Sequence, residues 1–224
     1  MNSAITAVLF DIDGTLVNSN DAHAESWVRA FSAHGITVDP ITVRRCIGMG
    51  GDQLMPAVSD LTEDSPLGRK IAARRGEIFR AQFLPRLAPL PGASELVDAV
   101  KALGLRAVAA SSASKEDLLP LLEVAGVKSL LDDWTSSDDA DESKPAPDIV
   151  EAALDRAHAS PGQAVMIGDT PYDIAAARSA GVRAIAFRTG GWLDPDLVGA
   201  IEIYDGPWDL LKRIEASLLS ERLA

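Results

Sequence analysis

The sequence predicts an α/β protein with a doubly wound parallel sheet and an inserted α-helical domain. Two features of the chain lead to this fold class. Short, continuously apolar runs alternate with helical segments, as expected of parallel strands that are covered on both faces. Between residues 17 and 89, by contrast, helical patterns follow one another without a convincing strand.

The individual elements of the sheet domain follow from the same patterns. The acidic, polar stretch 132–142 around Trp134 is expected to be a surface loop after a short strand. The predicted strands are residues 6–10, 105–110, 164–167, 184–187 and 201–204, and the predicted helices are 92–103, 115–125, 148–157 and 171–180.

The stretch without strands is interpreted as a cap over the carboxyl edge of the sheet. A proline-containing segment, residues 85–91, closes it as a stiff hinge. We therefore expect a helical cap domain at residues 17–89 and a core domain formed by residues 1–16 and 90–224. The alternative is a set of extra helices packed on one face of the sheet. The predicted cap helices are 22–34, 41–46, 53–58 and 68–83.

Composition and charge argue against several function classes. The chain of 224 residues has a net charge of -12, whereas non-specific nucleic-acid binding needs a basic face. No apolar run approaches the ~18 residues of a membrane span, and the N-terminus lacks the basic start of a secretion signal. Cys46 is the only cysteine, which excludes an internal disulfide. We expect a cytoplasmic protein that binds neither nucleic acid nor membrane.

The strongest chemical signal is the pair Asp11 and Asp13, directly after the first predicted strand. Side chains two residues apart in an extended segment share a side, so both can address one ion. Burying two acids beside a core strand is costly unless a cation or a reaction uses them. Mg²⁺ prefers oxygen ligands, and one aspartate can attack phosphorus while the other transfers protons. A polar turn after a strand is the alternative interpretation.

Three further strand ends carry polar groups suited to a phosphate or a metal. Ser111 or Ser112 is available to bind an anion, although a turn serine has the same pattern. Lys144 precedes a proline, which favours extended geometry and a fixed direction for its ammonium group, although a solvated lysine also fits. Asp169 is a candidate metal ligand, and Asp173 fits both metal support and helix capping. Ligands of open α/β sheets bind outside the carboxyl ends of the strands, where all these groups are expected.

Taken in this order, the four strand ends resemble the motifs of the haloacid dehalogenase-like (HAD) hydrolase superfamily. The run Asp-Ile-Asp-Gly-Thr-Leu at 11–16 is similar to the first motif and Ser112 to the second. Lys144 is similar to the third motif, and the Gly-Asp at 168–169 with Asp173 to the fourth. The similarity covers nearly the whole chain. The helical insertion resembles the C1 cap of the phosphoglycolate phosphatase and β-phosphoglucomutase branch.

The resemblance implies a role for each motif residue. Asp11 would be the nucleophile that forms an aspartyl-phosphate, and Asp13 would be the general acid and base. Ser112 would bind the transferring phosphoryl group, and Lys144 would balance charge on that group and on Asp11. Positioning and charge neutralisation of this kind suit phosphoryl transfer.

The resemblance also implies Mg²⁺ as the cofactor. Its ligands would be Asp11, the backbone carbonyl of Asp13, and Asp169, with support from Asp173. Mn²⁺ and Co²⁺ suit the same oxygen ligands to some degree.

Substrate contacts implied by the resemblance add Ala113, next to Ser112, and the cap residues His23 and Arg75. Position 51 is a glycine where β-phosphoglucomutases carry an arginine for the distal phosphate, which argues against a phosphomutase. We therefore expect a Mg²⁺-dependent phosphatase of a small phosphate ester, either a sugar phosphate or a phosphoglycolate-like compound, acting as a monomer or homodimer. The alternatives are a phosphomutase and a non-catalytic phosphate-binding module.

Overall fold

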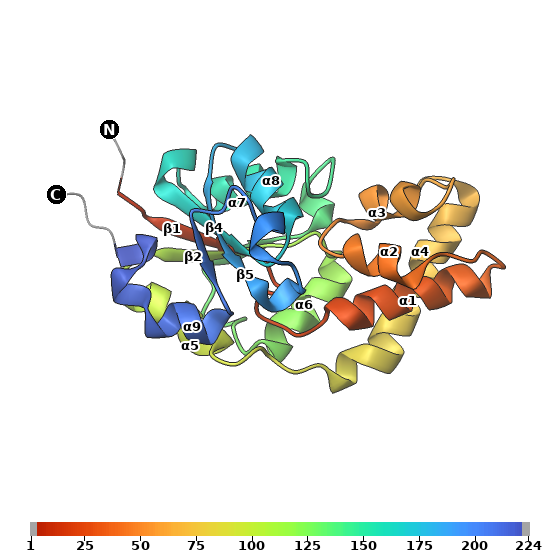
Figure 1. The fold of residues 1–224 in the computed structure, drawn as a ribbon, viewed down its shortest axis with the longest axis horizontal. Helices are drawn as coiled ribbons and strands as arrows, with labels where there is room; N and C mark the ends of the chain where they lie inside the picture. Colours follow the sequence, from red (N-terminus) through yellow and green to blue (C-terminus); the bar gives the residue numbers. More distant parts are fainter. Residues whose placement is uncertain (1–3, 221–224) are drawn as a thin grey trace.

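The structure, a computed structural model, describes residues 4–220 and contains a parallel sheet with the order β3-β2-β1-β4-β5-β6 (Figure 1). Leu9 in β1 lies between Val108 of β2 and Met166 of β4, so the register aligns the carboxyl ends of these strands. The order changes direction between β1 and β4, which is where ligands of doubly wound sheets bind. The strands are β1 (Ala7–Phe10), β2 (Arg106–Ala110), β3 (Asp133–Thr135), β4 (Ala164–Gly168), β5 (Arg183–Phe187) and β6 (Glu202–Tyr204).

Helices cover both faces of the sheet and continue beyond its carboxyl edge (Figure 1). The α-helices are α1 (Asn20–Ala33), α2 (Pro40–Arg45), α3 (Gly51–Val58), α4 (Pro66–Ile78), α5 (Ala93–Ala102), α6 (Lys115–Val124), α7 (Asp148–Ala157), α8 (Pro171–Ser179) and α9 (Pro207–Lys212). The short helical turns are η1 (Phe79–Phe83), η2 (Leu84–Arg86), η3 (Ser137–Asp139), η4 (Pro161–Gln163), η5 (Arg188–Gly190), η6 (Asp194–Asp196), η7 (Ile214–Ala216) and η8 (Leu218–Ser220).

Alternate residues of each strand face different helical layers. Val8 and Phe10 pack in a cluster with α5, α6 and α9, whereas Ala7 and Leu9 pack in a cluster with α7 and α8. All four residues of β1 are buried, because both faces of the sheet are covered. This double burial explains why the central strands are mainly apolar in sequence. The predicted α/β fold class is therefore confirmed.

Two parts of the sheet domain differ from the sequence-based expectations. The loop predicted for 132–142 was wrong for Asp133–Thr135, which pairs with β2 as the edge strand β3. This strand is short and contains an aspartate and a threonine, so it gives no apolar run. Helix α9 (Pro207–Lys212) was not predicted either.

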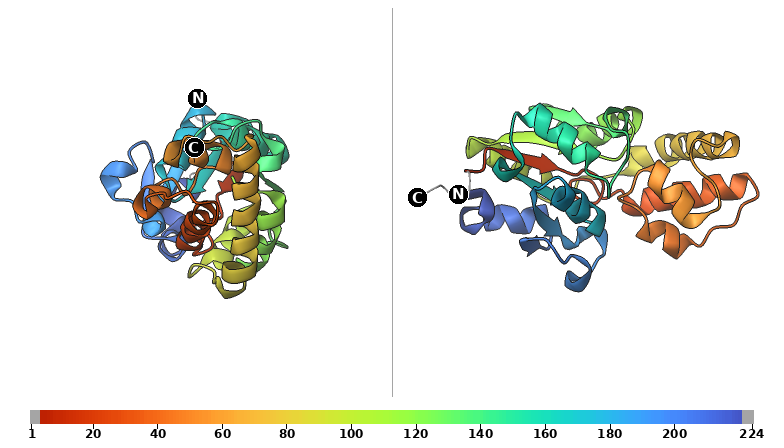
Figure 2. Two further views of the ribbon diagram at one scale, coloured as in Figure 1. Left: turned by 90° about the vertical axis from the view of Figure 1, so that its right-hand side faces the viewer. Right: turned by 90° about the horizontal axis from the view of Figure 1, so that it is seen from above.

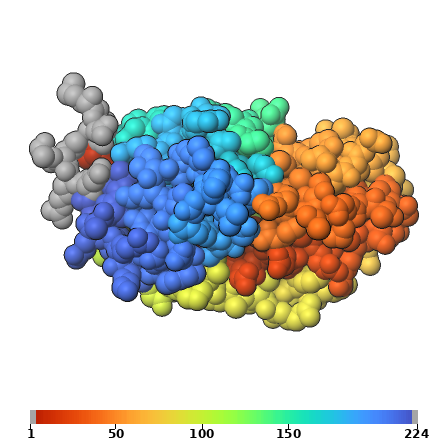
Figure 3. Space-filling view, in the orientation of Figure 1, coloured from red at the N-terminus to blue at the C-terminus, as the bar shows by residue number. Residues whose placement is uncertain are grey.

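Helices α1–α4 and the turn η1 form a layer beyond the carboxyl ends of the strands, as two views agree (Figures 1 and 2). This layer has its own apolar cluster, which includes Trp27, Phe31, Leu54 and Ile71. The space-filling view shows it in contact with the C-terminal half of the chain (Figure 3).

The two chain crossings between this layer and the sheet domain run side by side. The Asn18 N–H donates to the Ala88 carbonyl (3.1 Å), and the Leu90 N–H donates to the Leu16 carbonyl (2.8 Å). From the separate cluster and these paired crossings we propose the division expected from the sequence, a cap at 17–89 on a core of 1–16 and 90–224. Across residues 4–220, no helix has the length and apolar character needed to span a membrane.

Candidate active site

Asp11 lies at the centre of the site because it directly follows the buried strand β1. Its Oδ1 accepts a hydrogen bond from Lys144 Nζ (2.7 Å), and its Oδ2 accepts one from Thr15 Oγ1 (3.0 Å). Thr15 Oγ1 also lies 3.1 Å from Asp169 Oδ1. This hydroxyl therefore links the carboxylates that follow β1 and β4, at the point where the strand order changes direction.

Asp169 is fully buried and is held by residues of the first motif and the cap. Its Oδ2 accepts a hydrogen bond from Asn20 Nδ2 (2.8 Å), at the start of α1. A side chain at Gly14 would collide with this carboxylate, since its Cβ would lie 2.1 Å from Asp169 Oδ2. Gly14 also has a φ of +80°, a conformation that glycine adopts without strain. The glycine of the first motif thus lets the carboxylate approach the backbone.

Lys144 is fully buried, and its ammonium group has three partners. Nζ donates to Asp11 Oδ1 (2.7 Å), Asp173 Oδ1 (2.8 Å) and the Ala110 carbonyl (2.6 Å), which matches its three N–H donors. Burial by itself lowers the pKa of a lysine, but the charges of Asp11 and Asp173 outweigh it and raise the pKa of Lys144. The structure therefore holds a permanent cation between the strand ends.

Asp173 combines two tasks in the first turn of α8. Its Oδ2 accepts hydrogen bonds from the Thr170 N–H (3.0 Å) and Thr170 Oγ1 (2.6 Å), which completes a capping box. Its Oδ1 binds Lys144 instead. The Asp173 side chain packs directly against the backbone of Gly168. A Cβ added at position 168 would lie 2.4 Å from this side chain, so only glycine fits there. Both roles expected for Asp173 from the sequence, helix capping and support of a metal site, are compatible with its contacts.

The site contains more carboxylate groups than cations: Lys144 pairs with Asp11 and Asp173, and Asp169 lies beside them. Burial raises the pKa of Asp11 to about 7, against the opposing charge of Lys144, and Asp173 and Asp13 add to the rise. Burial and the neighbouring Asp11 raise the pKa of Asp169 well above its usual value. One oxygen each from Asp11, Asp169 and Asp173 lies within 4.8 Å of the others. A second cation would satisfy this group, and three hard oxygen donors suit Mg²⁺.

Asp13 points towards the cap and differs in its surroundings from Asp11. Its Oδ1 lies 2.8 Å from His23 Nε2 and also accepts a hydrogen bond from Ser19 Oγ. Burial alone raises the pKa of Asp13, but His23, Ser19 and Arg75 together hold it below its usual value. The pKa values of the two aspartates of the first motif are therefore shifted in opposite directions.

A pocket opens between the sheet domain and the cap, and only one of the two candidate serines lines it. Ser112 lines the pocket, and its buried Oγ has no hydrogen-bond partner. Ser111 instead accepts a hydrogen bond from the Ala113 N–H (3.1 Å) and stabilises the turn. Within residues 4–220, the pocket is lined by Asp11, Asp13, His23, Trp27, Ile47, Gly48, Met49, Gly50, Gly51, Arg75, Ser112 and Ala113.

Arg75 reaches this pocket from α4 and is fixed by a residue of the sheet domain. Its Nη1 donates to Asp117 Oδ2 (2.6 Å), and its guanidinium lies 5.2 Å from the centre of the Trp27 ring. Asp117 also accepts a hydrogen bond on Oδ1 from Arg80 (2.7 Å). One buried carboxylate at the start of α6 therefore binds two arginines of the cap segment.

Comparison with known proteins assigns the family. A family model described as haloacid dehalogenase-like hydrolase matches residues 8–187. This chain belongs to that family. A phosphoglycolate phosphatase of Cupriavidus necator is 30% identical over 226 residues, which cover 98% of this chain and 95% of the relative. A fructose-1-phosphate phosphatase of Escherichia coli is 28% identical over 193 residues, 84% of this chain and 99% of the relative.

A solved structure of a hydrolase from Pseudomonas syringae matches this HAD hydrolase with a TM-score of 0.88. It is 25% identical, and the match covers 94% of this chain and 98% of that one. Together the family model and the named phosphatases confirm a phosphoric monoester hydrolase of the phosphoglycolate phosphatase and β-phosphoglucomutase-like branch.

The structure brings the sequence-predicted site residues of this HAD hydrolase into one place. It also adds groups that the sequence analysis did not single out, namely Thr15, Asn20, Ser19 and Asp117. Thr15 carries a signal, since it lies in the same run as the two aspartates of the first motif. Asn20 and Asp117 resemble ordinary helix-start residues, so the sequence gives no reason to select them.

Proposed function

We propose that this HAD hydrolase is a Mg²⁺-dependent phosphatase of a small phosphorylated metabolite, a sugar phosphate or a phosphoglycolate-like compound, and that it works through an aspartyl-phosphate. The observation that carries the proposal is the group formed by Asp11, Lys144 and Asp169 at the strand ends, in which Asp11 lines a pocket together with the unpartnered Ser112 hydroxyl. The proposal is also supported by two relatives that are phosphatases of small metabolites.

The residues at the strand ends fit a magnesium ion. Asp11, the backbone carbonyl of Asp13, and Asp169 would hold it, while Asp173 supports the cluster through Lys144. When bound, the ion supplies positive charge to a phosphate group and to the carboxylates.

The protein groups then have distinct tasks in phosphoryl transfer. The Asp11 carboxylate attacks phosphorus, and its bond to the phosphoryl group replaces the ester bond. The Ser112 hydroxyl binds a phosphoryl oxygen, and the Lys144 ammonium balances charge on that group and on Asp11. Asp13 delivers a proton to the leaving oxygen and afterwards takes one from the water that hydrolyses the aspartyl-phosphate. His23 and Ser19 orient Asp13 for both steps.

Phosphate release tests this function directly. The protein is incubated with sugar phosphates, phosphoglycolate, nucleotides and 4-nitrophenyl phosphate, after removal of divalent metal and again after addition of Mg²⁺. We expect inorganic phosphate to be released from at least one small ester only when Mg²⁺ is present. Turnover that continues unchanged in chelator would contradict the metal requirement, and no turnover of any ester would contradict the phosphatase.

Magnesium is expected to stabilise the protein more at high pH than at low pH. Because the pKa of Asp11 is raised to about 7, the folded state keeps a proton that the unfolded chain releases near its ordinary pKa. The stability of the metal-free protein therefore falls as the pH rises between about 4 and about 7. Bound Mg²⁺ removes this penalty, so the gain in Tm should be several degrees larger at about pH 8 than at about pH 5. Thermal unfolding with Mg²⁺ and with chelator measures it, and equal gains at both pH values would contradict the expectation.

A cytoplasmic location and a monomeric or homodimeric state are proposed on the sequence argument alone. The proposed partner is a small-molecule phosphate ester.

A further inference from the structure

The two sides of the pocket carry different chemical groups. The core side carries the groups proposed to bind the phosphoryl group, so the remainder of the substrate faces the cap. We call the cap residues that line the pocket the cap wall; they are His23, Trp27, residues 47–51 and Arg75. The charge on this wall decides which remote ends a substrate can carry.

The cap wall offers little free positive charge. Of the residues within 4–220 that line the pocket, Arg75 is the only arginine or lysine. Arg75 pairs at 2.6 Å with Asp117, which it shares with Arg80. Arg80 also pairs with Glu116 at 3.2 Å, so two carboxylates balance the two arginines. His23 is likewise engaged by Asp13 at 2.8 Å. The Nε of Arg75 is buried and has no hydrogen-bond partner in this structure.

Carboxylates stand behind the remainder of the wall. Gly51 lines the pocket without a side chain, and a Cβ at this position would lie 2.8 Å from Glu63 Oε1. Burial raises the pKa of Glu63. The neighbouring Asp52 carboxylate raises the pKa of Glu63 further, whereas the positive charge of Arg75 lowers it. A site in which the pKa of a carboxyl group rises also disfavours the anionic end of a ligand.

We infer that the substrate is a monophosphate whose remote end is an uncharged hydroxylated group, and that the cap wall rejects a second phosphate or a carboxylate there. This inference rests on the proposed phosphatase function and narrows it from small phosphate esters to sugar- or polyol-type monophosphates. A hydroxyl group loses little on leaving water beside this wall, whereas a second anion would lose its hydration without gaining an uncompensated cation.

A matched pair of small substrates tests the inference. Phosphoglycolate and 2-hydroxyethyl phosphate differ only in a carboxylate against a hydroxymethyl group at the remote end. Fructose 1-phosphate and fructose 1,6-bisphosphate form a second pair with a sugar chain. We expect kcat/KM to favour the singly phosphorylated, uncharged-ended member of each pair by about tenfold or more, because like charges in a pocket repel strongly.

Two variants connect this preference to the cap wall. Glu63→Gln removes a carboxylate behind Gly51, and Asp117→Asn frees the charge of Arg75. Both should narrow the ratio of kcat/KM between the members of each pair about threefold or more. General loosening of the cap would lower kcat/KM for both members together and leave the ratio unchanged.

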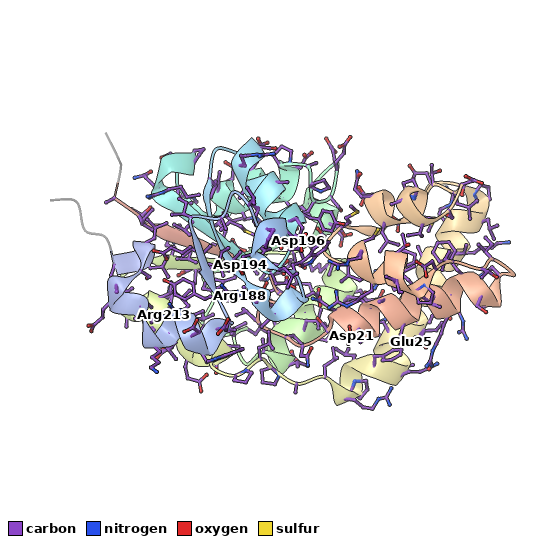
Figure 4. The ribbon with its side chains drawn as sticks, viewed as in Figure 1. Asp21, Glu25, Arg188, Asp194, Asp196 and Arg213 are labelled. Atoms are coloured by element: carbon purple, nitrogen blue, oxygen red, sulfur yellow. The ribbon has the colours of Figure 1, made fainter. Side chains whose placement is uncertain are left out.

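Glu25→Gln is the matched control, because it makes the same chemical change on the cap away from the pocket. Figure 4 labels Glu25 on α1. It lies two residues after His23 and therefore on about the opposite face of the helix, and its side chain is 47% exposed. The control should keep the wild-type ratio. A wild-type preference for phosphoglycolate or the bisphosphate, or an unchanged ratio in both wall variants, would overturn the inference. Absence of turnover even with 4-nitrophenyl phosphate would instead overturn the phosphatase proposal, and this inference with it.

Discussion

The Asp11→Asn variant is expected to lose phosphate release by a factor on the order of 10⁴ to 10⁶, as found when a nucleophile is removed from an enzyme. The amide cannot form the acyl-phosphate bond, and the other groups of the site remain. The loss should occur without unfolding. Because burial raises the pKa of Asp11, a neutral side chain at this position avoids the cost of a buried charge.

Steady-state phosphate release and thermal unfolding, measured on the same preparation, separate these effects. Intact-mass analysis after rapid acid quenching should show an added phosphoryl group on the wild type and none on the variant. Asp141→Asn, a change of the same type at an exposed position, should behave as wild type. Activity within tenfold of wild type in Asp11→Asn would show that another residue is the nucleophile.

Replacing Lys144 with methionine is expected to lower the free energy of unfolding by about 3–5 kcal/mol at about pH 8 without metal. The ammonium group is fully buried between Asp11 and Asp173, so its removal leaves these carboxylates without their cation. At lower pH the loss should shrink, because Asp11 takes up a proton as the pH falls through its raised pKa. Urea denaturation at both pH values measures the change.

Lys128→Met provides the control, since this lysine is about half exposed and pairs with Glu123 at the surface. Its free energy of unfolding should change by no more than about 0.5 kcal/mol. If Lys144→Met cost less than about 1 kcal/mol at high pH, the buried carboxylates would have another source of compensation.

The strands of the sheet were predictable from the sequence where burial on both faces requires apolar residues. Apart from the arginines that begin β2 and β5, the central strands β1, β2, β4 and β5 are apolar, because helices cover both of their faces. Strand β3 lies at the edge and contains polar residues, so its pairing with β2 is a tertiary property.

The composition of the site was predictable for a related reason. Parallel strands bring their carboxyl ends to one edge, so Asp11, Lys144 and Asp169 were expected to meet and do so. The choice between Ser111 and Ser112 was not fixed by the pattern, since both follow the same strand. In the structure Ser112 faces the pocket and Ser111 stabilises the turn.

Local sequence patterns were enough to predict which chemical groups stand at the strand ends and that a helical segment interrupts the sheet domain, because strand burial and helical period are local properties. Contacts between the cap and the sheet domain depend instead on the tertiary structure. Asn20 binds Asp169 across 149 positions, and Arg75 binds Asp117 across 42. Such contacts depend on how the cap lies over the sheet edge, and no local spacing encodes that orientation. The charge of the cap wall, and with it the proposed choice of substrate, therefore follows from packing rather than from any motif.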